Sequence, residues 1–412
     1  MRILHTSDWH LGRTLEGRSR LPEQREFVDE LCALVEAEDV HLVLLAGDVF
    51  DSFNPPAEAE NLFYEALERL AGGGRRAIVV IAGNHDSPER LRAASPLALT
   101  HGISLIGYPL ETVPPGRGKG GVERVASGPG WLELKIPGCE HHAVIGTLAY
   151  PSEARLNELL SPELGDSPLQ TAYSERVKAI LEGMAAHFRP DTVNLMVSHL
   201  FISGGRESES ERPIQLGGTL AVAAQALPAT AHYVALGHLH RPQSVEAAAA
   251  PCRYAGSPLA YSFSEADQQK EVVIVEVLPG RKASWRSVPL HCGWPLKMWC
   301  ASSLEEFFNW CRDERNLRCW VDLEIRAQEP LSPREVAEIR RHHPGVVNIK
   351  VLLPETEALD LARRRQALSL EEQFRLFAAR QLGSDPPQEL IDLFLELVNA
   401  GDENEVLGEA DL

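Results

Sequence analysis

The stretch IVVIAGNHD, residues 78–86, decides the fold. Its first five residues are β-branched or small apolar side chains, which is typical of a strand buried in a parallel sheet. The run ends at Gly83, and the polar residues Asn84, His85 and Asp86 follow it. Open α/β sheets bind ligands at the carboxyl ends of their strands, because the loops that leave the strands meet there. The stretch therefore predicts a binding site at the end of a buried strand.

Four other polar clusters have the same placement, each at the end of a short apolar run. They are Asp8 and His10 after residues 1–5, Asp48 and Asp51 after residues 40–46, His199 after residues 192–197, and His238 and His240 after residues 233–236. In extended chain, a spacing of two residues places both side chains of a pair on one face. We expect the five clusters to converge on one site.

The spacing of the apolar runs indicates an α/β fold. Helices are expected over residues 22–38, 57–71 and 88–101, so the first part of the chain alternates strand and helix, as parallel sheets with right-handed crossovers do. The glycine- and proline-rich residues 112–130 predict a surface loop, and the polar residues 204–212 predict a mobile loop. Further strands are expected at 131–136, 143–149, 272–277 and 283–288, with a helix at 169–187.

The pattern changes beyond Pro295. Strands at 296–301, 321–325 and 346–352 alternate with helices that begin at Leu304 and Pro333, which predicts a small second domain of β-α-β-α-β layout. From residue 355 the chain is helical and charged, with Ser369 and Glu372 forming a capping box and apolar residues at helical spacing over 387–399. The acidic residues 402–411 predict a disordered tail.

Length and composition bound the class of protein. A chain of 412 residues is expected to form two or three domains, and 44% hydrophobic with 24% charged residues describe a globular protein. The net charge of −19 argues against a protein that coats nucleic acid by bulk attraction, so contacts with phosphate must be local. No apolar run approaches the ~20 residues that span a bilayer, and the N-terminus lacks a signal peptide, so we expect a cytoplasmic location. The seven cysteines include no CxxC pair, which disfavours a thiolate zinc site.

The donor atoms of the five clusters predict a two-metal site. Seven nitrogen and oxygen donors without sulfur suit two divalent ions of the manganese, iron or magnesium type, and they are Asp8, His10, Asp48, Asn84, His199, His238 and His240. A carboxylate can bind one ion through each oxygen, and Asp48 is the candidate bridge. Two such ions serve phosphate-ester hydrolysis. His85 could stabilise the transition state or protonate the leaving oxygen, and Asp51 and Asp86 could orient the imidazoles.

The motifs themselves resemble a known family. Asp8-x-His10, Gly47-Asp48-x-x-Asp51, Gly83-Asn84-His85-Asp86, His199 and Gly237-His238-x-His240 are similar to the five motifs of the calcineurin-like metallophosphoesterases. The segments HTSDWHLG, AGDVFD, ALGHLH and RYAGSP narrow the resemblance to the SbcD family of nucleases. The resemblance implies a two-sheet α/β/β/α core. It also implies two Mn²⁺ ions, with Mg²⁺ or another divalent ion as a possible substitute. One ion would be bound by Asp8, His10, Asp48 and His240, and the other by Asp48, Asn84, His199 and His238. His85 would be catalytic and would bind neither ion.

The same resemblance implies a domain plan and partners. Residues 1–290 would form the nuclease domain, 291–354 a DNA-capping domain, 355–400 a helical region that binds an SbcC-type ATPase, and 401–412 the acidic tail. The helices at 57–71 and 88–101 would pair two copies of the chain, which gives a homodimer within a heterotetramer. The implied activity is Mn²⁺-dependent cleavage of double-stranded DNA ends and of hairpin or single-stranded DNA in repair and recombination.

Two other interpretations remain open at this point. The same metal pair serves phosphatases and cyclic-nucleotide phosphodiesterases, although the capping unit and helical tail favour a polymeric substrate. A non-catalytic scaffold on a degenerate phosphoesterase fold is the alternative outside enzymes. The complete set of seven donors and the presence of His85 argue against the scaffold.

Overall fold

The computed structural model describes residues 1–152, 155, 166–211 and 221–354, and beyond them 371–372, 374–375, 377–378 and 386–395. The capping residue Ser369, the acidic tail 401–412 and much of the predicted partner-binding region 355–400 therefore lie outside the described residues. By contacts the chain divides into two units. The first comprises residues 1–298, 314–322 and 345–348, and the second comprises residues 299–313, 323–344 and 349–412.

One sheet of the first unit has six strands in the order β16-β15-β1-β4-β5-β6. The strands β1 (Arg2–Thr6), β4 (Leu42–Ala46), β5 (Ala77–Ile81) and β6 (Ile103–Ile106) are parallel. The strands β15 (Glu271–Glu276) and β16 (Ser284–Pro289) extend the sheet antiparallel beside β1. The predicted parallel sheet is confirmed, and β1, β4 and β5 carry the first three polar clusters at the same edge.

The other sheet has eight strands in the order β13-β14-β12-β11-β10-β9-β8-β7. They are β7 (Gly116–Arg117), β8 (Glu123–Gly128), β9 (Trp131–Lys135), β10 (Ala143–Leu148), β11 (Val193–His199), β12 (Tyr233–Gly237), β13 (Gln243–Ser244) and β14 (Cys252–Tyr254). The prediction of a plain loop over 112–130 is wrong, because β8 pairs antiparallel with β9. Its sequence, ERVASG, lacks the continuous apolar run of the other strands, and a position near the edge of a sheet requires none.

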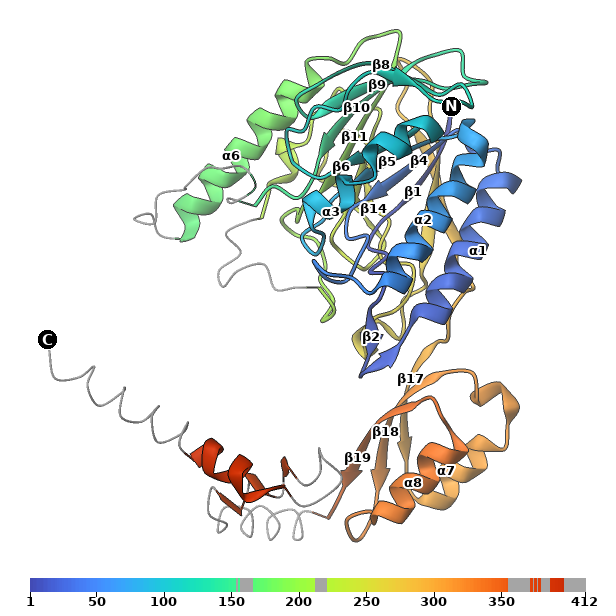
Figure 1. Ribbon diagram of the computed structural model, residues 1–412, viewed down its shortest axis with the longest axis vertical. Coiled ribbons are helices and arrows are strands. Elements are labelled where there is room, and N and C mark those ends of the chain that lie inside the picture. The colour runs from blue at the N-terminus through green and yellow to red at the C-terminus, as the bar shows by residue number, and fades with distance from the viewer. Residues whose placement is uncertain are drawn as a thin grey trace, which may run out of the picture. The chain divides into compact units, whose positions relative to one another are not determined.

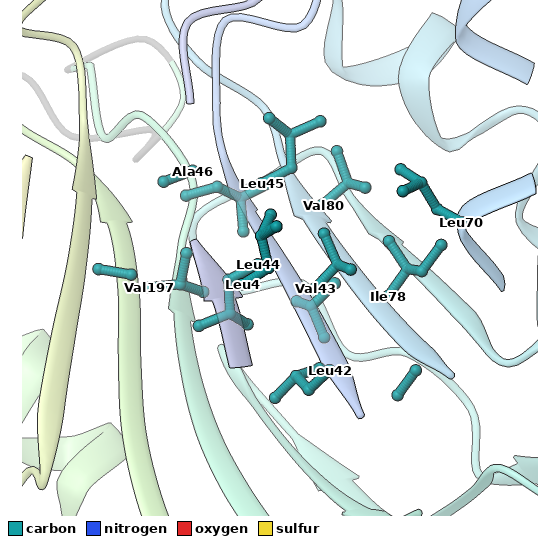
Figure 2. Packing of buried hydrophobic residues seen from close by; sticks show 14 of the residues in the cluster. Leu4, Leu42, Val43, Leu44, Leu45, Ala46, Leu70, Ile78, Val80 and Val197 are labelled. Carbon is teal, nitrogen blue, oxygen red and sulfur yellow. The ribbon is translucent and has the colours of Figure 1, made fainter. Parts of the chain in front are cut away.

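The two sheets pack face to face between helices. The helices α1 (Leu21–Ala37) and α2 (Ala57–Ala71) cover the outer face of the six-stranded sheet, and α6 (Asp166–Ala185) lies along the outer face of the other sheet (Figure 1). Leu44 of the first sheet and Val197 of the second belong to one buried cluster, and both side chains are fully buried (Figure 2). The first unit is therefore the two-sheet α/β/β/α fold that was predicted.

The predicted helix over 88–101 is divided into three. The chain forms α3 (Pro88–Arg92), α4 (Ser95–Ala98) and the 3-10 turn η2 (Leu99–His101). Pro96 has no N–H to donate and fits only the first turn of a helix, so a new helix begins at Ser95. The other short elements of this unit are β2 (Thr14–Leu15), β3 (Arg18–Ser19), η1 (Gly72–Gly74), η3 (Ala224–Ala226) and η4 (Phe263–Glu265).

The chain beyond Pro295 has the predicted β-α-β-α-β order. A three-stranded sheet in the order β17-β18-β19 is formed by β17 (Leu296–Ala301), β18 (Trp320–Arg326) and β19 (Val346–Leu352). The helices are α7 (Leu304–Cys311) and α8 (Pro333–His342), with η5 (Glu314–Asn316) between them in sequence. Ser303 caps α7, and Ser332 with Glu335 forms a capping box on α8. Among the helices of the described residues, none combines the length and the apolar character that crossing a membrane requires.

Candidate metal centre

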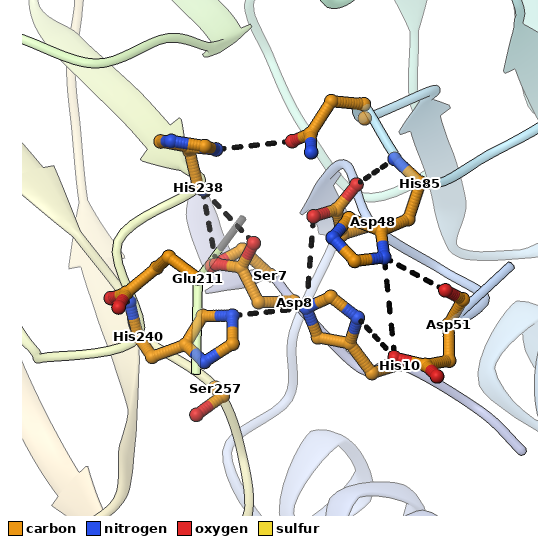
Figure 3. Close-up of polar contacts among 12 residues, drawn as sticks. Ser7, Asp8, His10, Asp48, Asp51, His85, Glu211, His238, His240 and Ser257 are labelled. Carbon is orange, nitrogen blue, oxygen red and sulfur yellow. Dashed lines mark hydrogen bonds and ion pairs between the residues drawn. The ribbon is translucent and has the colours of Figure 1, made fainter. Parts of the chain in front are cut away.

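The structure brings the five polar clusters together at one place. Asp8 and His10 follow β1, Asp48 follows β4, and Asn84 and His85 follow β5 in the first sheet, while His199 ends β11 and His238 and His240 follow β12 in the second sheet. Figure 3 shows the side chains from both sheets pointing toward one another. The parallel strands of both sheets end at this edge, which explains why clusters far apart in sequence meet.

One group of donors contains Asp8, His10 and His240. One ligand atom from each lies within 4.8 Å of the others, and none of the three residues is more than 1% exposed. The Nε2 atoms of His10 and His240 face each other at 3.0 Å. Two imidazole nitrogens and a carboxylate oxygen therefore surround a small buried space.

A second group contains Asp48, His199 and His238, whose ligand atoms also lie within 4.8 Å of one another. The Oδ1 atom of Asn84 lies 2.9 Å from Nε2 of His199 and 3.0 Å from Nδ1 of His238, so the amide belongs to this group. A Cβ on Gly83 would lie only 2.1 Å from Oδ1 of Asp48, which explains why glycine precedes Asn84. The close approach of the two strand ends depends on that missing side chain.

Asp48 lies between the two groups. Its Oδ2 atom is 3.6 Å from Nε2 of His10 in the first group and 3.4 Å from Nε2 of His199 in the second. Its Oδ1 atom accepts the backbone N–H of His85 at 2.9 Å. Asp48 thus has the position that a bridging carboxylate needs.

The donor set fits a pair of cations. Nδ1–H of His199 donates to the carbonyl of Ala46 at 2.9 Å, so a neutral ring has its lone pair on Nε2. The Nε2 atom lies 2.9 Å from Oδ1 of Asn84 and 3.4 Å from Oδ2 of Asp48, so its lone pair points toward other acceptors. Acceptors that converge in a buried space repel one another unless positive charge lies between them. A divalent ion bound by these atoms supplies that charge.

The electrostatics keep two of the imidazoles ready to bind metal, whereas the third, that of His199, must lose a proton when metal binds. Burial lowers the pKa of His10 and of His238 to about 3, so both rings are neutral at physiological pH. Burial also raises the pKa of Asp8 to about 6. Although burial alone would raise it, the pKa of Asp48 is held well below its usual range by His199 and the neighbouring imidazoles. In the metal-free protein the same carboxylate raises the pKa of His199 to about 9 against the effect of burial.

The backbone around these residues is strained. Asp8, His10, Asp48 and His238 all have positive φ angles, and they are four of the six non-glycine residues with positive φ in the described chain. Such conformations cost roughly 1–3 kcal/mol each and persist where the surrounding structure enforces them. The strand ends therefore bend away from regular geometry at the residues that carry the donors.

His85, Asp51 and Asp86 surround the two groups. Nδ1 of His85 lies 2.7 Å from the carbonyl oxygen of Asp51, and the Asp51 carboxylate lies 3.4 Å from Nδ1 of His10. These three residues, His10, Asp51 and His85, also meet the spacing of a possible metal group. The carboxylate of Asp86 accepts the backbone N–H groups of Val49, Phe50 and Gly83. Asp86 thus holds together the turns after β4 and β5.

The residues behind His240 were not predicted from the sequence. Ser210 is only 5% exposed, and its Oγ lies 2.5 Å from Nδ1 of His240. Glu211 accepts the backbone N–H of His240 at 2.7 Å. Residues 204–211 form a loop as predicted, but two of its residues, Ser210 and Glu211, contact the site, and Arg212 lies outside the described part. The run GGRESESER has the composition of a solvated loop, so composition gave no sign of the contact.

Comparison with known proteins decides the family. The profile of the calcineurin-like phosphoesterases matches residues 1–242. The chain is 46% identical over 407 residues to the SbcD component of the nuclease SbcCD from Bacillus subtilis (strain 168), covering 98% of this chain and 100% of that protein. The chain belongs to the SbcD family of calcineurin-like phosphoesterases. A second member of that family, the SbcD component of SbcCD from Rhodobacter capsulatus, is 36% identical over 293 residues, which are 70% of this chain and 69% of that protein.

A solved structure gives a weaker likeness. A dimetal phosphatase from Danio rerio aligns with 11% identity and a TM-score of 0.39, covering 70% of this chain and 95% of that one. This similarity is too low to bear on function. Membership of the SbcD family, by contrast, makes the chain a metal-dependent phosphoesterase.

Proposed function

We propose that this chain is a Mn²⁺-dependent DNA nuclease that works with an SbcC-type ATPase in DNA repair and recombination. The sequence similarity to the SbcD component of the nuclease SbcCD, which extends over 98% of this chain, supports DNA as the substrate and an SbcC-type ATPase as the partner. The observation that carries the chemistry is the position of Asp48, whose Oδ2 atom stands 3.6 Å and 3.4 Å from imidazole nitrogens of the two donor groups. The activity would include cleavage of double-stranded ends and of hairpin or single-stranded DNA.

In this proposal Asp8, His10, Asp48 and His240 hold one ion, and Asp48, Asn84, His199 and His238 hold the other. The absence of sulfur and the mixture of carboxylate, amide and imidazole suit Mn²⁺, with Mg²⁺ or another divalent ion as a substitute. Such a pair supplies a water nucleophile at neutral pH and neutralises charge that develops at phosphorus. The burial of Asp8, His10 and His240 keeps bulk water away from the ligands.

His85 would be the catalytic acid and would bind neither ion. Its ring is oriented by the 2.7 Å contact between Nδ1 and the Asp51 carbonyl, and its backbone N–H is held by Asp48. As an imidazolium it can donate the Nε2 proton to the oxygen that leaves phosphorus, or stabilise the negative charge there. The edge-to-face contact of its ring with His10, with centroids 4.7 Å apart, places it beside the first group.

The remaining parts of the chain would serve the polymeric substrate and the partners. We propose residues 1–290 as the nuclease domain, 291–354 as a DNA-capping domain and 355–400 as the region that binds the ATPase. The segments 57–71 and 88–101 would pair two copies of the chain in a heterotetramer, and Tyr64 and Leu97 on them are 40% and 74% exposed. The complex would act in the cytoplasm, on the DNA of the nucleoid.

Incubation of the purified chain with Mn²⁺ and linear or hairpin DNA, beside a small phosphomonoester, tests the proposal. We expect cleavage of both DNA substrates, loss of cleavage in EDTA, and recovery when Mn²⁺ is restored. Hydrolysis of the monoester alone would overturn the nuclease function in favour of a phosphatase. An absence of any metal-dependent hydrolysis would favour a scaffold.

A further inference from the structure

His240 differs from the other imidazoles of the site in how its ring is held. Its Nδ1 atom lies 2.5 Å from Oγ of Ser210, and that hydroxyl also hydrogen-bonds Oε1 of Glu265. Glu265 in turn forms an ion pair with Lys270. None of these three partners belongs to the five sequence motifs, and all are buried, with Ser210 5%, Glu265 0% and Lys270 7% exposed.

The ion pair between Glu265 and Lys270 decides which atom carries the proton in each of these hydrogen bonds. The ion pair with the ammonium of Lys270 keeps the carboxylate of Glu265 ionised, so this carboxylate can only accept hydrogen bonds. The single hydroxyl proton of Ser210 therefore goes to Glu265. The Oγ lone pair is then the acceptor for His240, which must carry its proton on Nδ1. The lone pair of His240 is consequently on Nε2, the atom that faces Nε2 of His10 at 3.0 Å.

Further hydrogen bonds of Lys270 hold Glu265 and Ser210 in place beside His240. Its ammonium donates to the backbone carbonyl of His240 at 3.0 Å and to Oγ of Ser257 at 3.0 Å. The loop that carries Ser210 is tied to the site at a second point, because Arg13 donates to the Ser210 carbonyl at 2.8 Å. The residues that orient His240 therefore come from two segments, the loop with Ser210 and the segment with Glu265 and Lys270, and the contact is made on the Nδ1 side of the ring.

The other group of donors is oriented without these residues. The ring of His199 is fixed by the carbonyl of Ala46, and Nδ1 of His238 lies 3.0 Å from Oδ1 of Asn84. No contact of Ser210 or Glu265 with either imidazole is found among the described residues. Loss of the hydrogen bonds that Ser210 and Glu265 make should therefore change metal binding at the Asp8–His10–His240 group and leave the other group unchanged.

We infer that Ser210, Glu265 and Lys270 are positioning residues that fix the tautomer of His240 and thereby set the affinity of the Asp8–His10–His240 group for its divalent ion. This inference rests on the proposed ligand assignment and deepens it. Partners of this kind behind a metal-binding histidine typically change metal affinity about 10- to 100-fold. The effect should be confined to one of the two ions.

Mn²⁺ binding to the full-length protein tests the inference without relying on activity. Isothermal titration of metal-free wild type, Ser210→Ala and Glu265→Gln would give the two affinities of each. We expect Ser210→Ala to weaken one ion by about 10- to 100-fold and to leave the other within about threefold. We expect Glu265→Gln to weaken the same ion, because a neutral amide holds the Ser210 proton less strongly.

Anomalous scattering from Mn²⁺-soaked crystals identifies which ion is lost. In Ser210→Ala, occupancy should fall at the Asp8–His10–His240 group and persist at the Asp48–His199–His238 group. The matched controls are Ser203→Ala and Glu209→Gln, which change exposed side chains of the same loop. Both controls should bind two ions as wild type does, and the controls and Ser210→Ala should unfold near the wild-type temperature in EDTA, whereas Glu265→Gln should unfold at a lower temperature because it leaves Lys270 without its buried partner.

The outcomes separate the inference from the function on which it rests. Unchanged affinities in both Ser210→Ala and Glu265→Gln, with two ions bound to wild type, overturn the positioning role alone. Equal weakening of both ions in Ser210→Ala, together with a lower unfolding temperature of that variant in EDTA, also overturns it, since the residue would then be merely structural. A wild-type protein that binds no pair of ions would instead overturn the ligand assignment itself.

Discussion

Replacement of Asp86 by asparagine should destabilise the first unit strongly, although Asp86 binds no ion in our assignment. The side chain is fully buried, and it joins the turn after β4 to the turn after β5. Oδ1 accepts the N–H of Phe50 at 2.9 Å, while Oδ2 accepts those of Val49 at 3.1 Å and Gly83 at 2.8 Å. Three backbone donors thus depend on one carboxylate.

The magnitude follows from counting acceptors. The asparagine oxygen can replace Oδ2 and keep two of the bonds, but the amide NH₂ then faces the N–H of Phe50. One buried donor without a partner costs about 1–3 kcal/mol, and the change from charged to neutral acceptor weakens each remaining bond by about 1 kcal/mol. The free energy of unfolding should therefore fall by about 3–5 kcal/mol, a large part of the roughly 5–15 kcal/mol that stabilises a typical protein.

Urea denaturation in EDTA, followed by circular dichroism, measures this change. The matched control is Asp267→Asn, an exposed aspartate whose replacement should change the free energy of unfolding by no more than about 0.5 kcal/mol. We also expect weaker Mn²⁺ binding in Asp86→Asn, because the turns that Asp86 joins carry Asp48 and Asn84. A loss of stability below about 1 kcal/mol would refute the reasoning, since it would mean that the three amides find other partners.

Four further predictions concern the metal pair and the partner. His85→Gln should lower DNA cleavage by about 100-fold or more, with two ions per chain retained in elemental analysis; loss of metal would show that His85 is a ligand. Asp48→Ala should abolish binding of one ion and weaken the other, and unchanged occupancy in the same measurement would exclude bridging. Saturation with Mn²⁺ at about 100 times Kd should stabilise the protein by about 2.7 kcal/mol per ion, seen as a rise in unfolding temperature of several degrees over EDTA. Removal of all residues after Pro354 should leave an active nuclease that no longer co-purifies with the ATPase, and retained co-purification would place the docking surface elsewhere.

The strands and the donors of the site could be predicted from the sequence because both are local signals. A buried parallel strand is a continuous apolar run, and the polar residue that ends it stands at the edge where ligands bind. Asp48 after LVLLA and Asn84 after AIVVI are examples, and their sheet is the one predicted. The helix over Ala57–Ala71 has the predicted bounds for the same reason, since its apolar residues repeat at helical spacing.

The features that were missed depend on partners distant in sequence. Strand β8 has little apolar pattern of its own and exists because β9 pairs with it. Ser210 lies in a run of small and charged residues, and only the fold brings it to His240, 30 residues away. The role of Asp86 was also hidden, since nothing in the letters GNHD shows that its carboxylate accepts amides from the turn after β4.

The charge of the site connects metal binding to the handling of DNA. The chain has a net charge of −19, and the donor groups hold the buried carboxylates of Asp8 and Asp48 beside imidazoles whose charge burial opposes. Without ions, these two carboxylates face one imidazolium, that of His199, whose pKa is about 9, so the pocket offers a phosphodiester no net positive charge. Two divalent ions bring four positive charges against these two carboxylates and reverse the sign of the local field. In the proposed nuclease, the ions would therefore create the attraction for phosphate as well as the chemistry, so DNA binding at this site should itself require metal, whereas contacts made elsewhere on the chain should not.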